Sequence, residues 1–127
     1  MTVLDASAAV AALLNSGPAR TILAEEDVHV PHLVDAEVAS ALRRLVLTDD
    51  IGADTAFRLL HLWQQLGLRR HAMVGLLDRV FELRASISPY DACYVALAEA
   101  LGTTLVTADG RLARANGLRC PLTVVPR

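Results

Sequence analysis

The sequence contains no lysine: all 12 of its basic residues are arginine, in a chain of 127 residues. A phosphate-binding P-loop needs a Gly-Lys pair and Schiff-base chemistry needs a lysine amine, so both are excluded. Aromatic residues make up only 4% of the chain, which leaves few rings for stacking on nucleic-acid bases. The formal net charge of −2 gives no general attraction to nucleic acid, so any RNA contact would need a local group of arginines.

Long hydrophobic runs and cysteine pairs are also missing. The longest apolar run, Ala8–Leu14, is far shorter than the ~20 residues that span a bilayer, and the first residues lack the basic segment of a secretory signal. The spacing of Cys93 and Cys120 fits neither a disulfide framework nor a metal site, so each is expected to be a small core residue. We therefore expect a cytoplasmic protein without a membrane segment.

Apolar residues, in contrast, are abundant at 54% of the chain. The length suits one domain, residues 1–127, because ~100 to 150 residues is the commonest domain size. The apolar content exceeds what a small monomer readily hides, which indicates a surface for a partner. The segment Ala53–Leu66, apolar over a wide arc, is the candidate for that surface, although Trp63 within it also fits the core.

Short β-prone runs alternate with helical segments along the chain. Strands are expected at Thr2–Leu4, Val28–Val30, Leu68–His71, Thr104–Thr107 and Leu122–Val125. Helices are expected at Ala6–Leu14, Ala19–Glu26, His32–Leu47, Ala53–Leu66, Val74–Arg84, Pro89–Leu101 and Arg111–Ala115. This alternation predicts an α/β fold, a three-layer α/β/α sandwich around a mainly parallel sheet.

Asp5 and Asp109 each follow a predicted strand and precede a predicted helix. Open parallel sheets bind their ligands at the carboxyl ends of strands. An aspartate in this place can equally be a helix N-cap, worth ~1 kcal/mol. Two strands that end in aspartate at opposite ends of the chain are better explained by one shared site, although each residue could serve both purposes.

Asp91 and Glu37 lie within predicted helices. Asp91 follows Ser88 and Pro89, where it could complete a helix cap, but it shares a helical face with apolar residues, and a carboxylate on a buried face needs a positive partner. Glu37 lies in the middle of its helix, so capping cannot explain it. Glu37 lies on the flank of the apolar stripe of its helix, and Arg44 lies on the same flank about 10 Å away by helical rise. The alternative interpretation is that this flank simply faces solvent.

The other acidic residues are not assigned to a site. Glu25, Glu26, Asp27, Asp49, Asp50 and Asp54 fall at element ends and loops, and Asp35, Asp78, Glu82 and Glu99 fit exposed helix faces. The remaining four, Asp5, Glu37, Asp91 and Asp109, form an oxygen-only set that suits Mg²⁺ or Mn²⁺. Hydrolysis of a phosphodiester by a metal-activated water is the chemistry that such a set predicts.

Four motifs, in order and over nearly the whole chain, resemble the PIN domain and most closely its VapC-type toxins. These motifs are Asp-Ala-Ser-Ala (5–8), Asp-Ala-Glu-Val-Ala-Ser-Ala-Leu-Arg-Arg (35–44), Ser-Pro-Tyr-Asp-Ala (88–92) and Val-Thr-Ala-Asp-Gly-Arg-Leu (106–112). Gly110 after Asp109 departs from the bulkier or acidic residues that are often found there, which leaves open whether one or two metals bind.

The resemblance implies an endoribonuclease toxin of a type II toxin-antitoxin system that cuts structured RNA such as tRNA or rRNA. It implies a catalytic and metal-binding quartet of Asp5, Glu37, Asp91 and Asp109, with Ser7 and Thr107 as supporting hydroxyls. It also implies Mg²⁺ or Mn²⁺ as cofactor, a homodimer, and inhibition by a cognate VapB-type antitoxin.

Other interpretations stay open at this stage. Arg44, Arg111 and Arg114 are candidates for RNA phosphate contacts, with exposed solubilising arginines as the alternative. A PIN-like scaffold that only binds RNA or antitoxin would keep the fold without turnover. A haloacid-dehalogenase-like phosphatase would use Asp5 as nucleophile, but residue 7 is serine and the lysine usual in such sites is absent.

Overall fold

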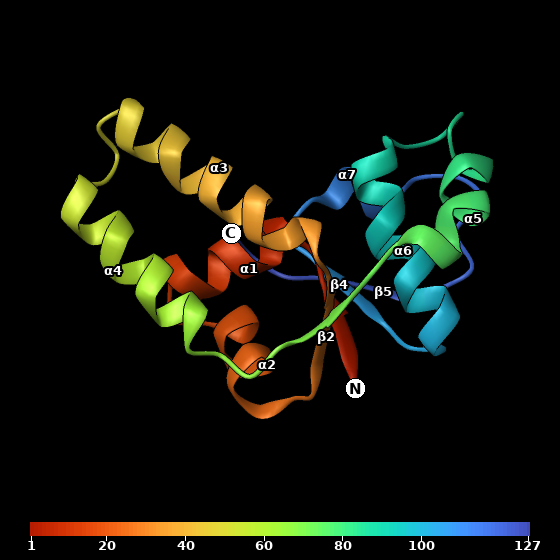
Figure 1. The fold of residues 1–127 in the computed structure, drawn as a ribbon, viewed down its shortest axis with the longest axis horizontal. Coiled ribbons are helices and arrows are strands. Elements are labelled where there is room, and N and C mark those ends of the chain that lie inside the picture. Colours follow the sequence, from red (N-terminus) through yellow and green to blue (C-terminus); the bar gives the residue numbers. More distant parts are fainter.

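The computed structural model describes all residues, 1–127, and has a single five-stranded sheet at its centre (Figure 1). The strand order is β3-β2-β1-β4-β5, and every neighbouring pair is parallel. The strands are β1 (Thr2–Leu4), β2 (Val28–Pro31), β3 (Arg69–His71), β4 (Leu105–Thr107) and β5 (Leu122–Val124). The three central strands are buried along their whole length, as expected for a parallel sheet covered on both faces.

Helices cover both faces of the sheet, which confirms the predicted three-layer α/β/α architecture. One face is covered by α6, which packs on β1, β2 and β4, and by α5 behind it; α1 packs on the other face, against α2, α3 and α4. The helices are α1 (Ala6–Leu14), α2 (Pro18–Glu25), α3 (Leu33–Leu47), α4 (Ala53–Gln64), α5 (Leu77–Glu82), α6 (Pro89–Leu101) and α7 (Gly110–Ala113). In Figure 1, α3 and α4 form a helical hairpin that extends away from α5, α6 and α7.

Helix caps fix the starts of the helices that follow β1 and β4. Asp5 is the N-cap of α1 and accepts from the Ala8 amide; Asp109 is the N-cap of α7 and accepts from the Arg111 amide. Ser88 caps α6, with Pro89 in its first turn, where proline's fixed φ suits the helix. The capping roles of Asp5 and Asp109 are therefore real, and a carboxylate that caps a helix still has lone pairs with which it can serve a site.

Small residues let α1 approach the sheet closely. Ala8, Ala9 and Ala12 are almost completely buried between β-strands and neighbouring helices. Trp63 of α4 is also buried, at 3% exposure, and its indole N–H donates to Asp35 of α3 at 2.7 Å. Trp63 therefore belongs to the packing between the two helices rather than to a free surface.

Three predictions are corrected in detail. The segment Val74–Arg84 is not one helix: it begins as a 3₁₀ turn, Val74–Leu76, and continues as the short α5, with Gly75 weakening the α-helical start. Asp35 is not simply on an exposed face, because it also pairs with Arg70 at 2.8 Å. Glu99, also predicted on an exposed face, is half-buried and accepts a bidentate pair of hydrogen bonds from Arg79. No helix is long and apolar enough to cross a membrane.

Candidate active site

The site lies at the carboxyl ends of the two central strands β1 and β4. The sheet order reverses here, because β2 lies on one side of β1 and β4 on the other. Open α/β sheets bind ligands in the crevice at such a switch point. The Asp5 amide donates to the Val106 carbonyl at 3.0 Å, which fixes the end of β1 against β4 and brings residues more than 100 positions apart together.

Asp5 is held by three donors on a buried floor. Its Oδ1 accepts from the Ser7 hydroxyl at 2.6 Å and from the Ala8 amide at 2.9 Å, and its Oδ2 accepts from the Thr107 hydroxyl at 2.5 Å. Asp5 is only 4% exposed. The predicted supporting roles of Ser7 and Thr107 therefore have a physical counterpart, since both hydroxyls orient this carboxylate.

The same two hydroxyls also connect to the start of α7. Ser7 Oγ lies 3.2 Å from Thr107 Oγ1 and accepts from the Ala108 amide at 2.9 Å. The Asp109 amide donates to Thr107 Oγ1 at 3.0 Å. This network places Asp109 next to Asp5 with little freedom for either backbone.

Glu37 reaches the site from α3, on the side of the sheet crevice opposite α6. Its Oε1 accepts a 2.5 Å hydrogen bond from the hydroxyl of Tyr94. Tyr94 lies on α6 and is 1% exposed, so a rigid side chain sets the direction of this carboxylate. Asp91, one turn earlier on α6, is half-buried.

The charges of the four carboxylates act on one another. Burial raises the pKa of Asp5, Glu37 and Asp91 above the ordinary carboxyl range. Neighbouring negative charges add to each rise: Asp109 acts on Asp5, Asp91 and Asp5 act on Glu37, and Asp5 and Asp109 act on Asp91. The four carboxylates predicted from the sequence therefore lie near enough to one another for their charges to interact.

Asp109 differs from the other three. A hydrogen bond from Arg111 holds the pKa of this carboxyl below its usual range. Arg111 Nε lies 3.3 Å from Oδ1 of Asp109, and the arginine side chain is 84% exposed. Such an exposed ion pair contributes little to stability, so a cation of higher charge can displace the arginine from Asp109.

The donor set fits a hard divalent cation in its chemistry. All four groups offer carboxylate oxygen, the ligand that Mg²⁺ and Mn²⁺ prefer, and a cation would relieve the repulsion among them. As the side chains stand, no group of three or more acidic, histidine or cysteine side chains converges closely enough to hold a metal ion. Oε1 of Glu37 bonds to Tyr94, which leaves its Oε2 available, whereas Asp109 is paired with Arg111 and would have to leave this arginine to reach a metal.

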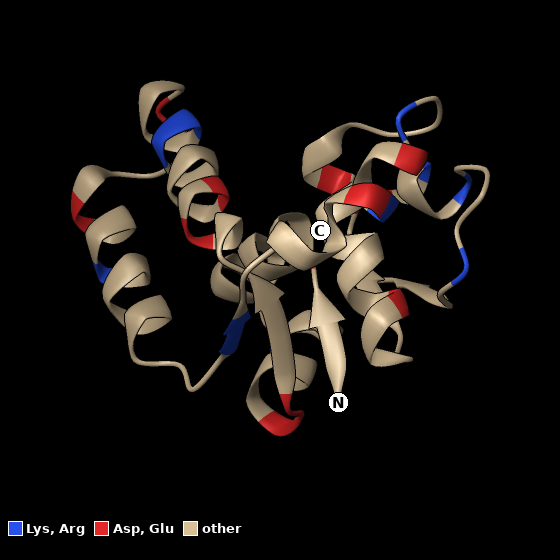
Figure 2. Cartoon of the chain, turned by 45° about the vertical axis from the view of Figure 1, so that its right-hand side comes forward, with Lys and Arg blue, Asp and Glu red and all other residues tan.

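Charged residues are spread unevenly around the site. In Figure 2, acidic positions occur on α3 and on the helices of the opposite half, and several arginine positions lie on the loops of that half. A cavity of about 390 Å³ opens between α1 and α3, lined by Ser7, Glu37 and Arg44 among others, with the C-terminal Arg127 at its edge. Arg44 thus shares a cavity with Glu37, as their spacing predicted.

The other two predicted arginines lie across the site on α7 and its end. Arg111 is paired with Asp109, and Arg114 Nη1 lies 3.6 Å from where a Cβ on Gly110 would stand. A Cβ at position 110 would therefore make an ordinary van der Waals contact with Arg114. Both arginines are exposed.

Sequence reasoning missed two residues of the site, Tyr94 and Arg127. Tyr94 shares a helical face with Asp91, which is the signal that could have placed it there, but its pairing with Glu37 joins residues 57 positions apart. Arg127 donates from Nε to the Ala108 carbonyl at 3.3 Å and its charge acts on Asp109. Nothing in the sequence around Arg127 indicates that position.

Fold and site together define a class: a parallel α/β domain with an acidic, hydroxyl-supported site at the switch point of its sheet. A model of the PIN domain matches residues 2–118. Ribonuclease VapC9 of Mycobacterium tuberculosis is 57% identical over 127 residues, covering 100% of both chains. The chain therefore belongs to the PIN-domain family, in its group of VapC-type toxin ribonucleases.

Solved structures agree with this fold. VapBC2 from Rickettsia felis, solved bound to a DNA fragment from its promoter, matches with a TM-score of 0.70 at 15% identity, over 98% of each chain. VapC20 of Mycobacterium tuberculosis, described as a sarcin-ricin loop cleaving toxin, matches with a TM-score of 0.65 at 19% identity, over 90% of this chain and 94% of its own. At these identities the likeness concerns the fold.

Proposed function

We propose that this protein is a divalent-metal-dependent endoribonuclease toxin that cleaves structured RNA and is inhibited by a cognate antitoxin. The observation that carries the proposal is the gathering of Asp5, Glu37, Asp91 and Asp109, three of them with raised pKa values, at the switch point of the sheet. Acidic side chains without a permanent cationic partner are expensive to bury. They are retained where a cation completes the site.

Each carboxylate has a distinct role in the proposal. Asp5, fixed by Ser7 and Thr107, is the rigid ligand, and Glu37 and Asp91 are ligands from the facing helices. Asp109 would be the fourth ligand, and Arg111, whose pair with Asp109 is exposed, would then be available to a substrate phosphate. Bound Mg²⁺ or Mn²⁺ would supply charge neutralisation at the scissile phosphate and a water of lowered pKa as nucleophile.

Positively charged residues border the site on both sides, as an RNA backbone requires. Arg44 lies on α3 beside Glu37, and Arg111 and Arg114 lie on α7 beyond Asp109. The acidic floor alone would repel RNA. We therefore assign these arginines to phosphate contacts that offset this repulsion.

A protein partner is also part of the proposal. An apolar cavity of about 230 Å³ between α3 and α4 is lined by Leu42, Val46, Ala56, Phe57 and Leu60, among others. Phe57 is 64% exposed, and apolar surface of this kind supports an antitoxin or a second subunit. We propose the VapB-type antitoxin as the occupant, a homodimer as the assembly, and the cytoplasm, where RNA substrates reside, as the place of action.

The rival functions are less well supported by the geometry. A haloacid-dehalogenase-like phosphatase usually has a lysine in its site and a second aspartate two residues after the nucleophile, whereas this chain has no lysine and Ser7 bonds to Asp5 in that place. A non-catalytic scaffold has no need for four mutually repelling carboxylates. Cleavage assays distinguish the scaffold from the enzyme: Mn²⁺ should support RNA cleavage, whereas Ca²⁺ should support binding with little cleavage.

The proposed site is tested by metal-dependent thermal stability. Because a ligand at 100 times its Kd adds ~2.7 kcal/mol to the folded state, Mn²⁺ should raise the Tm of the wild type by roughly 8 °C. Asp91→Asn should remove most of this rise. Asp78→Asn, an exposed position on α5, is the matched control and should leave it unchanged. An equal Mn²⁺ response in all three proteins would refute the metal site.

A further inference from the structure

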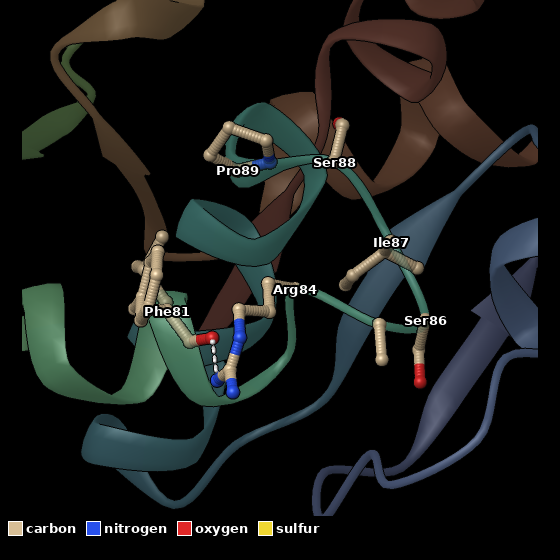
Figure 3. Close-up of a pocket in the computed structure, with 8 residues that line it drawn as sticks. Phe81, Arg84, Ser86, Ile87, Ser88 and Pro89 are labelled. Atoms are coloured by element: carbon tan, nitrogen blue, oxygen red, sulfur yellow. Dashed lines mark hydrogen bonds between the residues drawn. The ribbon is translucent and has the colours of Figure 1, made fainter.

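A third cavity lies beside the start of α6. It has a volume of about 430 Å³, within the range of small-molecule sites, and is lined by Val80, Phe81, Arg84, Ile87, Ser88 and Pro89 among others. Figure 3 shows Phe81 and Arg84 together at one end and Ser88 and Pro89, on the first turn of α6, at the other. No role described so far uses this cavity.

Phe81 and Arg84 form a prebuilt stacking platform at the mouth of the cavity. The Phe81 ring is 68% exposed, and the Arg84 guanidinium carbon lies 4.7 Å from its centroid. Arg84 Nη1 also donates to the Phe81 carbonyl at 3.1 Å, which holds the planar guanidinium in place. Arg84 takes part in no ion pair with a carboxylate, so its charge remains available to a ligand.

The cavity is physically joined to the acidic site through Ser88. This residue lines the cavity and is the N-cap of α6, where its hydroxyl accepts from the Asp91 amide at 3.2 Å. Asp91 lies three residues further along the helix, about 4.5 Å by helical rise. A strand of RNA with its phosphate at Asp91 would therefore place a neighbouring nucleotide at the cavity.

The geometry points to a base-binding subsite: we infer that this cavity receives one unpaired nucleobase of the RNA, next to the scissile phosphodiester. The inference rests on the proposed ribonuclease function and names the feature of the substrate that the site selects. A base would stack on Phe81 or on the guanidinium plane of Arg84, as single-stranded RNA does on aromatic and arginine surfaces. The hydroxyls of Ser86 and Ser88 offer hydrogen bonds to the edge of the base.

Charge favours RNA over a purely apolar partner in this place. If an apolar partner covered this surface, the charge of Arg84 would lose its water without gaining a counter-charge, which costs free energy. A nucleotide avoids this cost, because its base stacks on the Phe81 ring and its phosphate pairs with the guanidinium. Phe57 on α4 gives the contrast, because it lines a cavity made almost entirely of apolar residues. The two exposed phenylalanines therefore belong to different kinds of surface.

The test measures RNA binding in an Asp91→Asn background, which separates binding from cleavage. The probe is a fluorescently labelled RNA hairpin with an unpaired loop, compared with the same hairpin carrying abasic loop nucleotides. Phe81→Ala and Arg84→Gln should each weaken binding of the base-containing loop about tenfold, within the range of base–aromatic stacking. Phe81→Ala should leave binding of the abasic loop unchanged, and Arg84→Gln should weaken it less than it weakens binding of the base-containing loop, because a phosphate contact of Arg84 is common to both hairpins.

The controls are matched in residue type and exposure. Phe57→Ala, at a ring that is 64% exposed, and Arg58→Gln, an exposed arginine on α4, should leave both affinities unchanged. Thermal unfolding of every variant identifies any loss of fold. Arg84→Gln keeps the test valid if Phe81→Ala is unstable, because Arg84 is exposed.

The possible outcomes are distinct. Unchanged binding in Phe81→Ala and Arg84→Gln, or equal losses for both hairpins, would overturn the subsite. A dimer that becomes monomeric in Phe81→Ala, with no selective loss for the base-containing loop, would also overturn it and make this face a subunit interface. Selective loss of loop binding supports the subsite. If the wild type then fails to cut RNA with Mn²⁺, only the proposed nuclease function fails.

Discussion

At the scale of the residue, Tyr94 determines where the carboxylate of Glu37 points. The hydroxyl of Tyr94 donates at 2.5 Å from a fully buried ring, so it acts on the site through Glu37 and is a positioning residue. Partners that orient metal ligands typically contribute ~10- to 100-fold to affinity or activity. Removal of one hydroxyl leaves the ring and the packing of α6 in place.

We predict that Tyr94→Phe weakens Mn²⁺ binding by roughly tenfold with little change in fold. Calorimetric titration of the protein with Mn²⁺, without RNA, measures the affinity directly, and circular dichroism monitors the fold. Tyr90→Phe is the control, since Tyr90 is 64% exposed on the same helix. Wild-type Mn²⁺ affinity in Tyr94→Phe would show that Glu37 needs no such orientation.

The four carboxylates could be proposed from the sequence because local rules describe the position of each one. Asp5 and Asp109 end strands, Asp91 follows a Ser-Pro cap, and Glu37 has no capping role. Tyr94 was not assigned to the site, because its partner lies on another helix and only the packed fold brings the two together. The same holds for Arg127, which folds back from the C-terminus onto Ala108.

At the scale of the element, Asp35 ties three segments together. Its carboxylate accepts from Trp63 Nε1 on α4 at 2.7 Å and from Arg70 on β3 at 2.8 and 2.9 Å, while Asp35 itself lies on α3. The sequence predicted an exposed face, because helical periodicity shows which side of a helix is apolar but not which neighbour covers its edge. The single helix predicted over Val74–Arg84 was wrong for a related reason: Gly75 favours a break that apolar spacing does not reveal.

We predict that Asp35→Asn lowers the free energy of unfolding at pH 7 by about 1 to 2 kcal/mol, a range reduced for solvent screening. The hydrogen bond from Arg70 lowers the pKa of Asp35 below 3.8 in the folded state. The stabilisation is therefore complete above the unfolded pKa and is lost as the pH falls through the folded value.

Urea denaturation followed by circular dichroism measures this effect at pH 7 and at pH 3. The difference between wild type and Asp35→Asn should shrink at the lower pH. Asp54→Asn, on the exposed first turn of α4, is the control and should match the wild type at both values. A constant difference across pH would assign the effect to packing rather than to the charge of Asp35.

At the scale of the whole molecule, the parallel order β3-β2-β1-β4-β5 explains why residues from four parts of the chain meet. The sequence predicted this layering from the alternation of strands and helices. It could not predict how the apolar excess is distributed: Trp63 is buried, while Phe57, Phe81 and Leu47 are exposed on two separate parts of the surface. Such a division depends on packing between helices that periodicity treats one at a time.

With a net charge of −2, the protein as a whole does not attract RNA, so binding depends on a few arginines near the site. With no overall positive field, affinity must come from a few arginines, and each phosphate contact contributes about −0.7 to −0.9 to the slope of log K against log salt. If Arg44, Arg111 and Arg114 make the contacts, the slope is about −2 to −3. A protein that bound RNA through a broad basic surface would give a much steeper value.

We predict this slope for RNA binding by the Asp91→Asn variant, measured by fluorescence anisotropy from low to moderate NaCl. Arg44→Gln should reduce its magnitude by about 0.7 to 0.9, because one phosphate contact is lost. Arg58→Gln on the outer side of α4 should not change it. A slope steeper than about −5, or one that Arg44→Gln leaves unaltered, would mean that the RNA follows a path over the molecule that avoids the cavity shared by Arg44 and Glu37.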